Sequence, residues 1–142
     1  MATLETNPGG SYRTLSFERA TAGDAMRAGV ITCPPEASLR QVARIMATEH
    51  IHSVIVRDRD TWMVLTDTDL LRAAGVDLDA ATAGEVATAE LPEVGAADPL
   101  ERAAQLMADR RTTHALVTGE SGRPVGVLST LDIAGILAWG RA

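Results

Sequence analysis

The sequence predicts an α/β (α+β) fold in which two β-α-β-β-α repeats pack about a pseudo-two-fold axis into one module. The first observation is a duplicated pattern, because the residues around Met46 return around Met107 at an offset of 61. The second is a Thr/Ser-x-x-Asp motif that begins at Thr66 and again at Ser129, an offset of 63. The third is composition: 46% of the residues are hydrophobic, but only 3% are aromatic. A core of small aliphatic side chains favours close packing of helices on a sheet.

Charge and cysteine content narrow the class of protein. The 142 residues carry a formal charge of −6 without a Lys/Arg run, which makes nucleic acid an unfavoured partner. Cys33 is the only cysteine, so no intrachain disulfide can form, and no metal-ligand spacing is present. No stretch reaches the ~20 apolar residues of a membrane span, and the N-terminus lacks a hydrophobic signal region. We expect a cytoplasmic protein without a metal site, in which Cys33 is a small buried hydrophobe.

The first repeat, with its lead-in, is predicted over residues 14–75, after a flexible N-terminus at 1–13. Three short elements precede its main helix: a strand or lead-in at 14–17, a helix at 22–26 and an extended segment at 30–33. The main helix begins at Ser38, which forms a capping-box pattern with Gln41. Its apolar stripe recurs at helical spacing through Leu39, Val42, Ala43 and Met46.

A hairpin and a second helix complete the first repeat. The β-branched run in 52–57 predicts a buried strand, and 62–65 follows after a loop short enough for a hairpin. A helix is predicted from Thr66 to Ala74, ended by Gly75. Residues 76–82 are expected to link the repeats.

The second repeat, 83–142, follows the same order. Its predicted elements are a short helix at 83–87, an extended entry at 91–95, a helix with an apolar stripe from Leu100 to Met107, strands at 115–117 and 125–128, and a closing helix at 132–138. Asp98 is expected to cap the main helix, with Pro99 at its first position. The closing helix carries Ile133, Ile136, Leu137 and Trp139, and this apolar face suits either an oligomer surface or packing within the chain.

Over residues 20 to 138 the chain resembles a tandem pair of cystathionine β-synthase (CBS) domains, also called a Bateman module. The second repeat carries the most diagnostic stretch, Gly-Arg-Pro-Val-Gly-Val-Leu-Ser-Thr-Leu-Asp, which ends at Asp132. The first repeat has the matching end, Val-Leu-Thr-Asp-Thr-Asp, but lacks the glycines of the turn. The linker is similar to that of stand-alone actinobacterial proteins with two CBS domains. The resemblance implies a disc-like homodimer of two chains.

The resemblance also implies a site at the head of the second helix of each repeat. There Asp69 and Asp132 would take the ribose hydroxyls of an adenosine ligand, while Thr66 and Ser129 would lie near its phosphate. A carboxylate suits a diol, and a helix N-terminus offers N–H groups to an anion. The same spacing is also a capping box, which any helix can use, and both roles can hold together.

The other half of the implied site comes from the entries to the core strands. The candidates are Thr32, His52 and Ser53 in the first repeat, and Val94, Arg111, Thr113 and His114 in the second. Thr32 and Val94 belong to extended entries that would line the adenine through backbone groups. The histidines also suit surface hydrogen bonds, and Arg111 suits a solvated charge at a helix end.

The two repeats differ in the walls of this implied site. Glu93 would repel a phosphate if it faced inward, which makes the first repeat marginally the better anion site. Gly122 and Gly126 allow closer backbone approach in the second repeat. One site, or neither, can therefore retain its ligand.

These observations support three functions to different degrees. The first is a non-catalytic regulatory module that senses AMP, ADP, ATP or S-adenosylmethionine and acts on an unidentified protein partner, with no cofactor required. The second is a structural or stress-response homodimer without physiological nucleotide binding. An enzyme is disfavoured, because no nucleophile lies in a recognisable motif beside a base and no Walker loop occurs.

Overall fold

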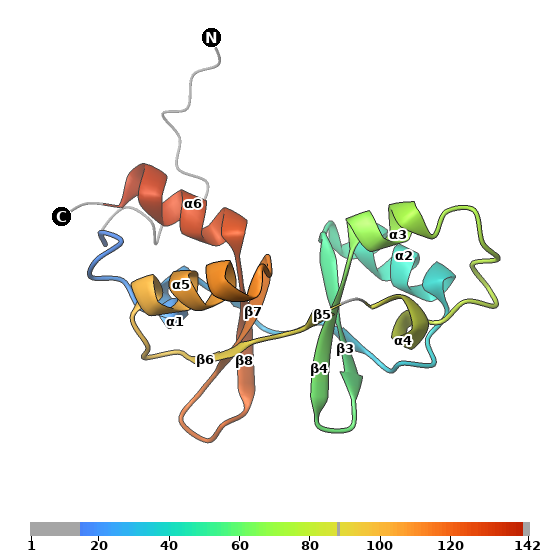
Figure 1. Cartoon of the computed structure of the whole chain (residues 1–142), viewed down its shortest axis with the longest axis horizontal. Coiled ribbons are helices and arrows are strands. Elements are labelled where there is room, and N and C mark those ends of the chain that lie inside the picture. The colour runs from blue at the N-terminus through green and yellow to red at the C-terminus, as the bar shows by residue number, and fades with distance from the viewer. Residues whose placement is uncertain (1–14, 88, 141–142) are drawn as a thin grey trace, which may run out of the picture. The chain divides into compact units, whose positions relative to one another are not determined.

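The computed structural model describes residues 15–87 and 89–140, and its fold is mixed α+β as the sequence predicts (Figure 1). Two compact units form within the chain. The contiguous unit comprises residues 30–91, and the split unit comprises residues 15–29 together with 92–140. Each unit contains a four-stranded sheet of mixed direction.

The contiguous unit has the strand order β2-β3-β4-β5. Its strands are β2 (Thr32–Cys33), β3 (Ser53–Asp58), β4 (Thr61–Thr66) and β5 (Ala89–Glu90), and its helices are α2 (Leu39–Glu49), α3 (Asp67–Arg72) and α4 (Ala83–Val86). Strand β2 runs parallel to β3, whereas β4 is antiparallel to both β3 and β5. The predicted main helix and hairpin are confirmed, including the reciprocal capping box of Ser38 and Gln41.

The split unit has the strand order β1-β8-β7-β6. Its strands are β1 (Arg27–Ala28), β6 (Glu93–Gly95), β7 (His114–Thr118) and β8 (Pro124–Ser129), and its helices are α1 (Ala22–Ala25), α5 (Leu100–Arg110) and α6 (Thr130–Trp139). Strand β6 is parallel to β7, and the other pairs are antiparallel. No helix in the described part of the chain is long and apolar enough to cross a membrane.

Each sheet buries one face against its helices. Since paired residues share a face of a sheet, the core clusters define that face. In the contiguous unit Cys33, Val54, Val56 and Leu65 pack with the apolar stripe of α2. In the split unit Val94, Ala115, Val117 and Leu128 pack with the stripe of α5. The expected burial of Cys33 is confirmed, and that burial raises the pKa of its thiol.

The units do not coincide with the two sequence repeats, because each repeat gives its first helix to the other unit. α1 and β1 precede the first repeat's core strands but belong to the split unit, and α4 and β5 belong to the contiguous unit. A repeated Ala-Thr-Ala-Gly, at 20–23 and 81–84, marks both exchanged segments. The sequence interpretation recognised the two short helices but missed strands β1 and β5, which are only two residues long.

The exchanged segments cap the main helices. Leu39 N–H of α2 donates to Ala81 O at 3.0 Å, and Leu100 N–H of α5 donates to Ala20 O at 2.9 Å. The first N–H groups of a helix have no partner within the helix, so these carbonyl groups satisfy donors that would otherwise need water. The repeated Ala-Thr-Ala-Gly is therefore a docking segment for a helix N-terminus.

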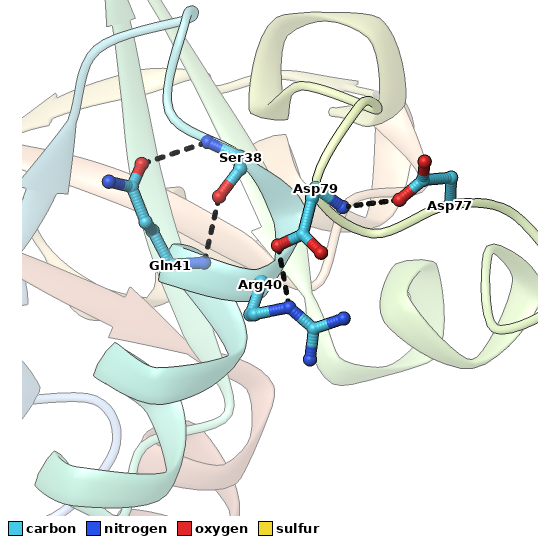
Figure 2. A network of polar contacts seen from close by, with 5 residues as sticks. All are labelled: Ser38, Arg40, Gln41, Asp77 and Asp79. Atoms are coloured by element: carbon cyan, nitrogen blue, oxygen red, sulfur yellow. Dashed lines mark hydrogen bonds and ion pairs between the residues drawn. The ribbon is translucent and has the colours of Figure 1, made fainter.

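Side chains reinforce this docking in the contiguous unit (Figure 2). Arg40 Nε lies 2.6 Å from Asp79 Oδ1, and Asp79 N–H donates to Asp77 Oδ1 at 3.0 Å. Arg40 N–H also donates to Leu78 O at 3.1 Å. The linker of residues 76–82 is thus held on the first turn of α2 by backbone and side-chain contacts together.

Some sequence predictions about local structure are wrong. Pro99, not Asp98, takes the N-cap position of α5, and Asp98 Oδ2 instead accepts from Gly95 N–H at 2.8 Å. Helix α3 ends at Arg72, before Gly75, because Ala73 already takes the C-cap position. Of the two alternatives for residues 14–17, the strand is not formed, since residues 15 and 16 have no regular structure and Phe17 begins a turn, and the lead-in remains. Thr14 and the N-terminus 1–13 lie outside the described residues. The closing helix begins earlier than predicted, at Thr130.

Candidate ligand site

The Thr-x-x-Asp motif of the contiguous unit caps helix α3. Thr66 N–H donates to Asp69 Oδ2 at 2.8 Å, and Asp69 N–H donates to Thr66 Oγ1 at 3.3 Å. Asp69 is only 3% exposed, and Arg72 Nη1 lies 3.9 Å from its Oδ1. The predicted capping role is therefore realised by the motif.

The Ser-x-x-Asp motif of the split unit repeats this geometry at α6. Ser129 N–H donates to Asp132 Oδ2 at 2.9 Å, Ser129 Oγ donates to the same oxygen at 3.0 Å, and Asp132 N–H donates to Ser129 Oγ at 3.2 Å. Asp132 is 8% exposed. In both motifs the Oδ2 atom of the aspartate serves the cap by accepting from the N-cap backbone N–H.

The sheet of the contiguous unit gathers the predicted polar residues on one face. Ser53 pairs with Thr66 across β3 and β4, and Thr32 pairs with Ile55, two residues further along β3. Side chains two residues apart in a strand share a face, so Thr32, Ser53 and Thr66 lie on the face opposite the core. The structure thus brings these three predicted residues to the same face as the head of α3.

In the split unit the same alternation of side chains along the strands brings a negatively charged residue to the equivalent face of the sheet. His114 pairs with Ser129, and Glu93 pairs with Leu116, so all four lie on the sheet face away from the cluster that packs against α5. Glu93 takes the position that Thr32 has in the contiguous unit. Val94 pairs with Val117 and its side chain belongs to the core, which leaves only its backbone for a ligand.

His52 of the contiguous unit is paired with a carboxylate that sequence reasoning missed. His52 Nδ1 lies 2.9 Å from Asp67 Oδ2, and Asp67 N–H donates to His52 O at 2.9 Å. The hydrogen bond from His52 lowers the pKa of Asp67 below its ordinary value. The signal available in the sequence was an acidic residue directly after the motif threonine, in the first turn of a predicted helix.

The corresponding residues of the split unit are Thr113 and His114 at the start of β7, and Arg111 at the end of α5. Thr113 Oγ1 lies within hydrogen-bond distance of His114 Nδ1, at 2.8 Å. Arg111 is the C-cap of α5, with a left-handed backbone (φ 55°) and an exposed side chain. Its position suits the alternative of a solvated charge at a helix end.

Gly126, expected to let a ligand approach the backbone, has a packing role instead. A Cβ there would lie 2.5 Å from Met26 Sδ and 2.6 Å from Arg27 O. The absence of a side chain therefore lets the exchanged strand β1 pair with β8. Gly122, in contrast, has a positive φ of 79° and serves the turn between β7 and β8.

The repeated unit, its sheet parity and its paired Thr/Ser-x-x-Asp helix heads define a tandem CBS domain protein. The chain belongs to the CBS domain family, whose model matches residues 22–75 and 83–138. Among curated proteins it is similar to hypoxic response protein 1 of Mycobacterium tuberculosis (strain CDC 1551 / Oshkosh). The two are 31% identical over 119 residues, which cover 80% of this chain and 82% of the relative.

Solved structures give the same class. A crystal structure of hypoxic response protein I with two coordinated zinc ions is 32% identical, with a TM-score of 0.64 over 81% of this chain and 97% of the other. A CBS domain protein from Pyrobaculum aerophilum, complexed with AMP, is 28% identical, with a TM-score of 0.69 over 83% of this chain and 98% of the other. The predicted family and fold class are confirmed.

Zinc binding does not follow for this chain from that similarity. Within residues 15–87 and 89–140 no group of three His, Cys, Asp or Glu side chains is placed to hold a metal ion. Cys33 is buried and its pKa is raised, which disfavours the thiolate that zinc requires. The donor set in the described part of the chain does not fit a zinc site.

Proposed function

We propose that this protein is a non-catalytic regulatory module that binds an adenosine-containing ligand, AMP, ADP, ATP or S-adenosylmethionine, at its Thr/Ser-x-x-Asp helix heads. One observation carries the proposal: both units place a motif hydroxyl beside a polar strand residue on the sheet face opposite the core. The pairs are Thr66 with Ser53 and Ser129 with His114. The AMP complex of the Pyrobaculum relative supports the choice of ligand class.

The chemistry of each head suits a nucleotide. A carboxylate that caps a helix is held in a fixed orientation, and a carboxylate is a paired acceptor that suits the two hydroxyls of a ribose. The motif hydroxyl and the positive end of the helix dipole favour a nearby anion. Such binding would alter the geometry of a homodimer and so act on a protein partner in the cytoplasm, without any cofactor.

Calorimetry with AMP, ADP, ATP and S-adenosylmethionine tests this function. Replacing Asp69 or Asp132 by alanine should abolish binding at that unit. Because both carboxylates also cap a helix, Ser38→Ala serves as the control: it removes the cap of α2 but touches neither motif. Binding that survives both aspartate substitutions would refute the ribose assignment, and the absence of any ligand below millimolar concentration would refute the sensor function. Hydrolysis of a ligand dependent on either aspartate would indicate an enzyme instead.

A second candidate is a structural or stress-response homodimer that binds no nucleotide, and exposed leucines favour the association on which it depends. Leu131 and Leu137 of α6 are 70% and 63% exposed, and Leu71 of α3 is 75% exposed. Large apolar side chains on surface helices often mark association surfaces. Sedimentation of the protein at micromolar concentration should give a dimer, and Leu131→Lys with Leu137→Lys should give a monomer. A wild-type monomer would refute association through these helices.

A further inference from the structure

Asp67 occupies the groups that an anion would use at the head of α3. Its Oδ2 lies 2.9 Å from His52 Nδ1, and its Oδ1 accepts from Thr68 N–H at 2.8 Å. An imidazole and a backbone N–H at a helix N-terminus are typical phosphate ligands. One carboxylate of the chain itself therefore engages both of them.

This carboxylate is charged and exposed, and it belongs to the residue that directly follows Thr66, which we propose lies near the phosphate. The hydrogen bond from His52 lowers the pKa of Asp67, so Asp67 is ionised at neutral pH. The side chains of His52 and Asp67 are 77% and 55% exposed. An anionic group approaching Thr66 would meet a negative charge already paired with the histidine.

The split unit lacks this charge at the corresponding position. Thr130 follows Ser129 as Asp67 follows Thr66, and Thr130 N–H donates to Thr113 O as Asp67 N–H donates to His52 O. The backbone is the same, but the side chain is neutral. Glu93, which shares the sheet face of Ser129, lies on β6, two strands away from Ser129 in the sheet order.

We propose that Asp67 is a specificity-determining residue that imitates an anion within the contiguous unit. It excludes di- and triphosphates there and leaves that unit for an adenosine ligand with little negative charge. The split unit then retains the greater tolerance for phosphate. This inference rests on the proposed function, and it reverses the expectation that the first repeat is the better anion site.

The test compares the full-length protein with Asp67→Thr, which installs the residue of the other unit, and with Asp67→Asn, which removes the charge at nearly constant shape. The probes are AMP, ATP and inorganic phosphate, measured by calorimetry and by NMR shifts of the Thr68 and Leu131 amides. Both variants should bind phosphate and ATP about fivefold more tightly at Thr68, the effect expected for one exposed charge. Thr130→Asp should weaken phosphate binding at Leu131 by a similar factor.

Asp60→Asn is the matched control, because it removes one acidic charge at the far end of the same hairpin, beside the Asp58–Thr61 pair. Its affinities should equal those of the wild type. If neither Asp67 variant binds phosphate or ATP more tightly than this control, the inference is overturned. If Thr68 gains phosphate affinity but no adenosine ligand binds any variant, anion exclusion stands and the proposed function fails.

Discussion

Replacing Thr112 by valine should stabilise the protein, because its hydroxyl is the buried side-chain oxygen without a hydrogen-bond partner in the described part of the chain. Thr112 follows the end of α5, where Arg111 N–H donates to Ala108 O and Thr112 N–H donates to Met107 O. This pair of bonds is a Schellman motif, in which the second residue after the helix normally packs an apolar side chain against the last turn. The equivalent residue of the contiguous unit is Ile51, which packs against its core.

The expected change in the free energy of unfolding follows from the unpaired hydroxyl of Thr112. Burying such a group without a partner costs about 1 to 3 kcal/mol, and valine keeps the shape while replacing the oxygen by a methyl group. We expect Thr112→Val to raise the free energy of unfolding by about 1 kcal/mol, which corresponds to roughly 3 °C in Tm for a chain of this length. The reciprocal change, Ile51→Thr, should lower it by about 2 kcal/mol, because it adds a buried hydroxyl and removes core volume.

Urea unfolding followed by circular dichroism measures both changes. Thr113→Val is the control, since Thr113 is exposed and its hydroxyl lies beside His114; its effect should stay within about 0.5 kcal/mol. If Thr112→Val destabilises the protein, the hydroxyl has a partner that matters and the reasoning is refuted.

Three further outcomes are expected. Arg111→Gly should raise the free energy of unfolding by about 0.5 to 1 kcal/mol in thermal unfolding, because glycine adopts the left-handed C-cap conformation without strain. A lower free energy of unfolding would mean that the arginine makes a stabilising contact. Gly126→Ala should lower the free energy of unfolding by about 2 kcal/mol or more, because its Cβ would overlap Met26 Sδ and the β1 backbone. If the variant unfolds in urea at the same concentration as the wild type, β1 does not pair with β8 at this position. Arg40 lowers the pKa of Asp79, so the stability from this pair is present above the carboxyl's unfolded pKa and is lost as the pH falls below it. The Tm difference between wild type and Asp79→Asn should therefore disappear in acid and shrink in high salt, and a pH-independent difference would contradict the ion pair.

Sequence reasoning predicted the parts of the fold that rest on periodicity. Helices α2 and α5 and the two hairpins carry long apolar patterns, and their spacing alone identifies the core stripes of Leu39–Met46 and Leu100–Met107. The exchanged strands could not be found that way, because two residues show no period. The predicted cap by Asp98 is wrong because a local interaction competes with it: the Asp98 carboxylate accepts a hydrogen bond from Gly95 N–H.

The candidate site was predictable in its residues but not in their pairings. The motif positions Thr66 and Ser129 follow from the repeat, and their shared sheet face follows from strand parity once the register is known. The contact of His52 with Asp67 depends on where the strand entry meets the helix head, which no spacing in the sequence specifies. Long-range side-chain pairs of this kind need coordinates.

Each sequence repeat contributes its first short helix to the unit built around the other repeat, so a repeat and a compact unit contain different residues. The sequence repeat of residues 14–75 lacks Ala81 O, which satisfies Leu39 N–H, and it lacks strand β5, which pairs with β4. The stretch from 30 to 91 contains both. The donor of the Leu39 amide bond and its acceptor therefore lie within this one continuous segment, as do both strands of the β4–β5 pair. The split unit needs residues 20–28 from the start of the chain for the same purpose, since Leu100 N–H donates to Ala20 O. The docking segments at 20–23 and 81–84 therefore connect each main helix to residues outside its own sequence repeat. A single repeat does not contain all the hydrogen bonds of a compact unit.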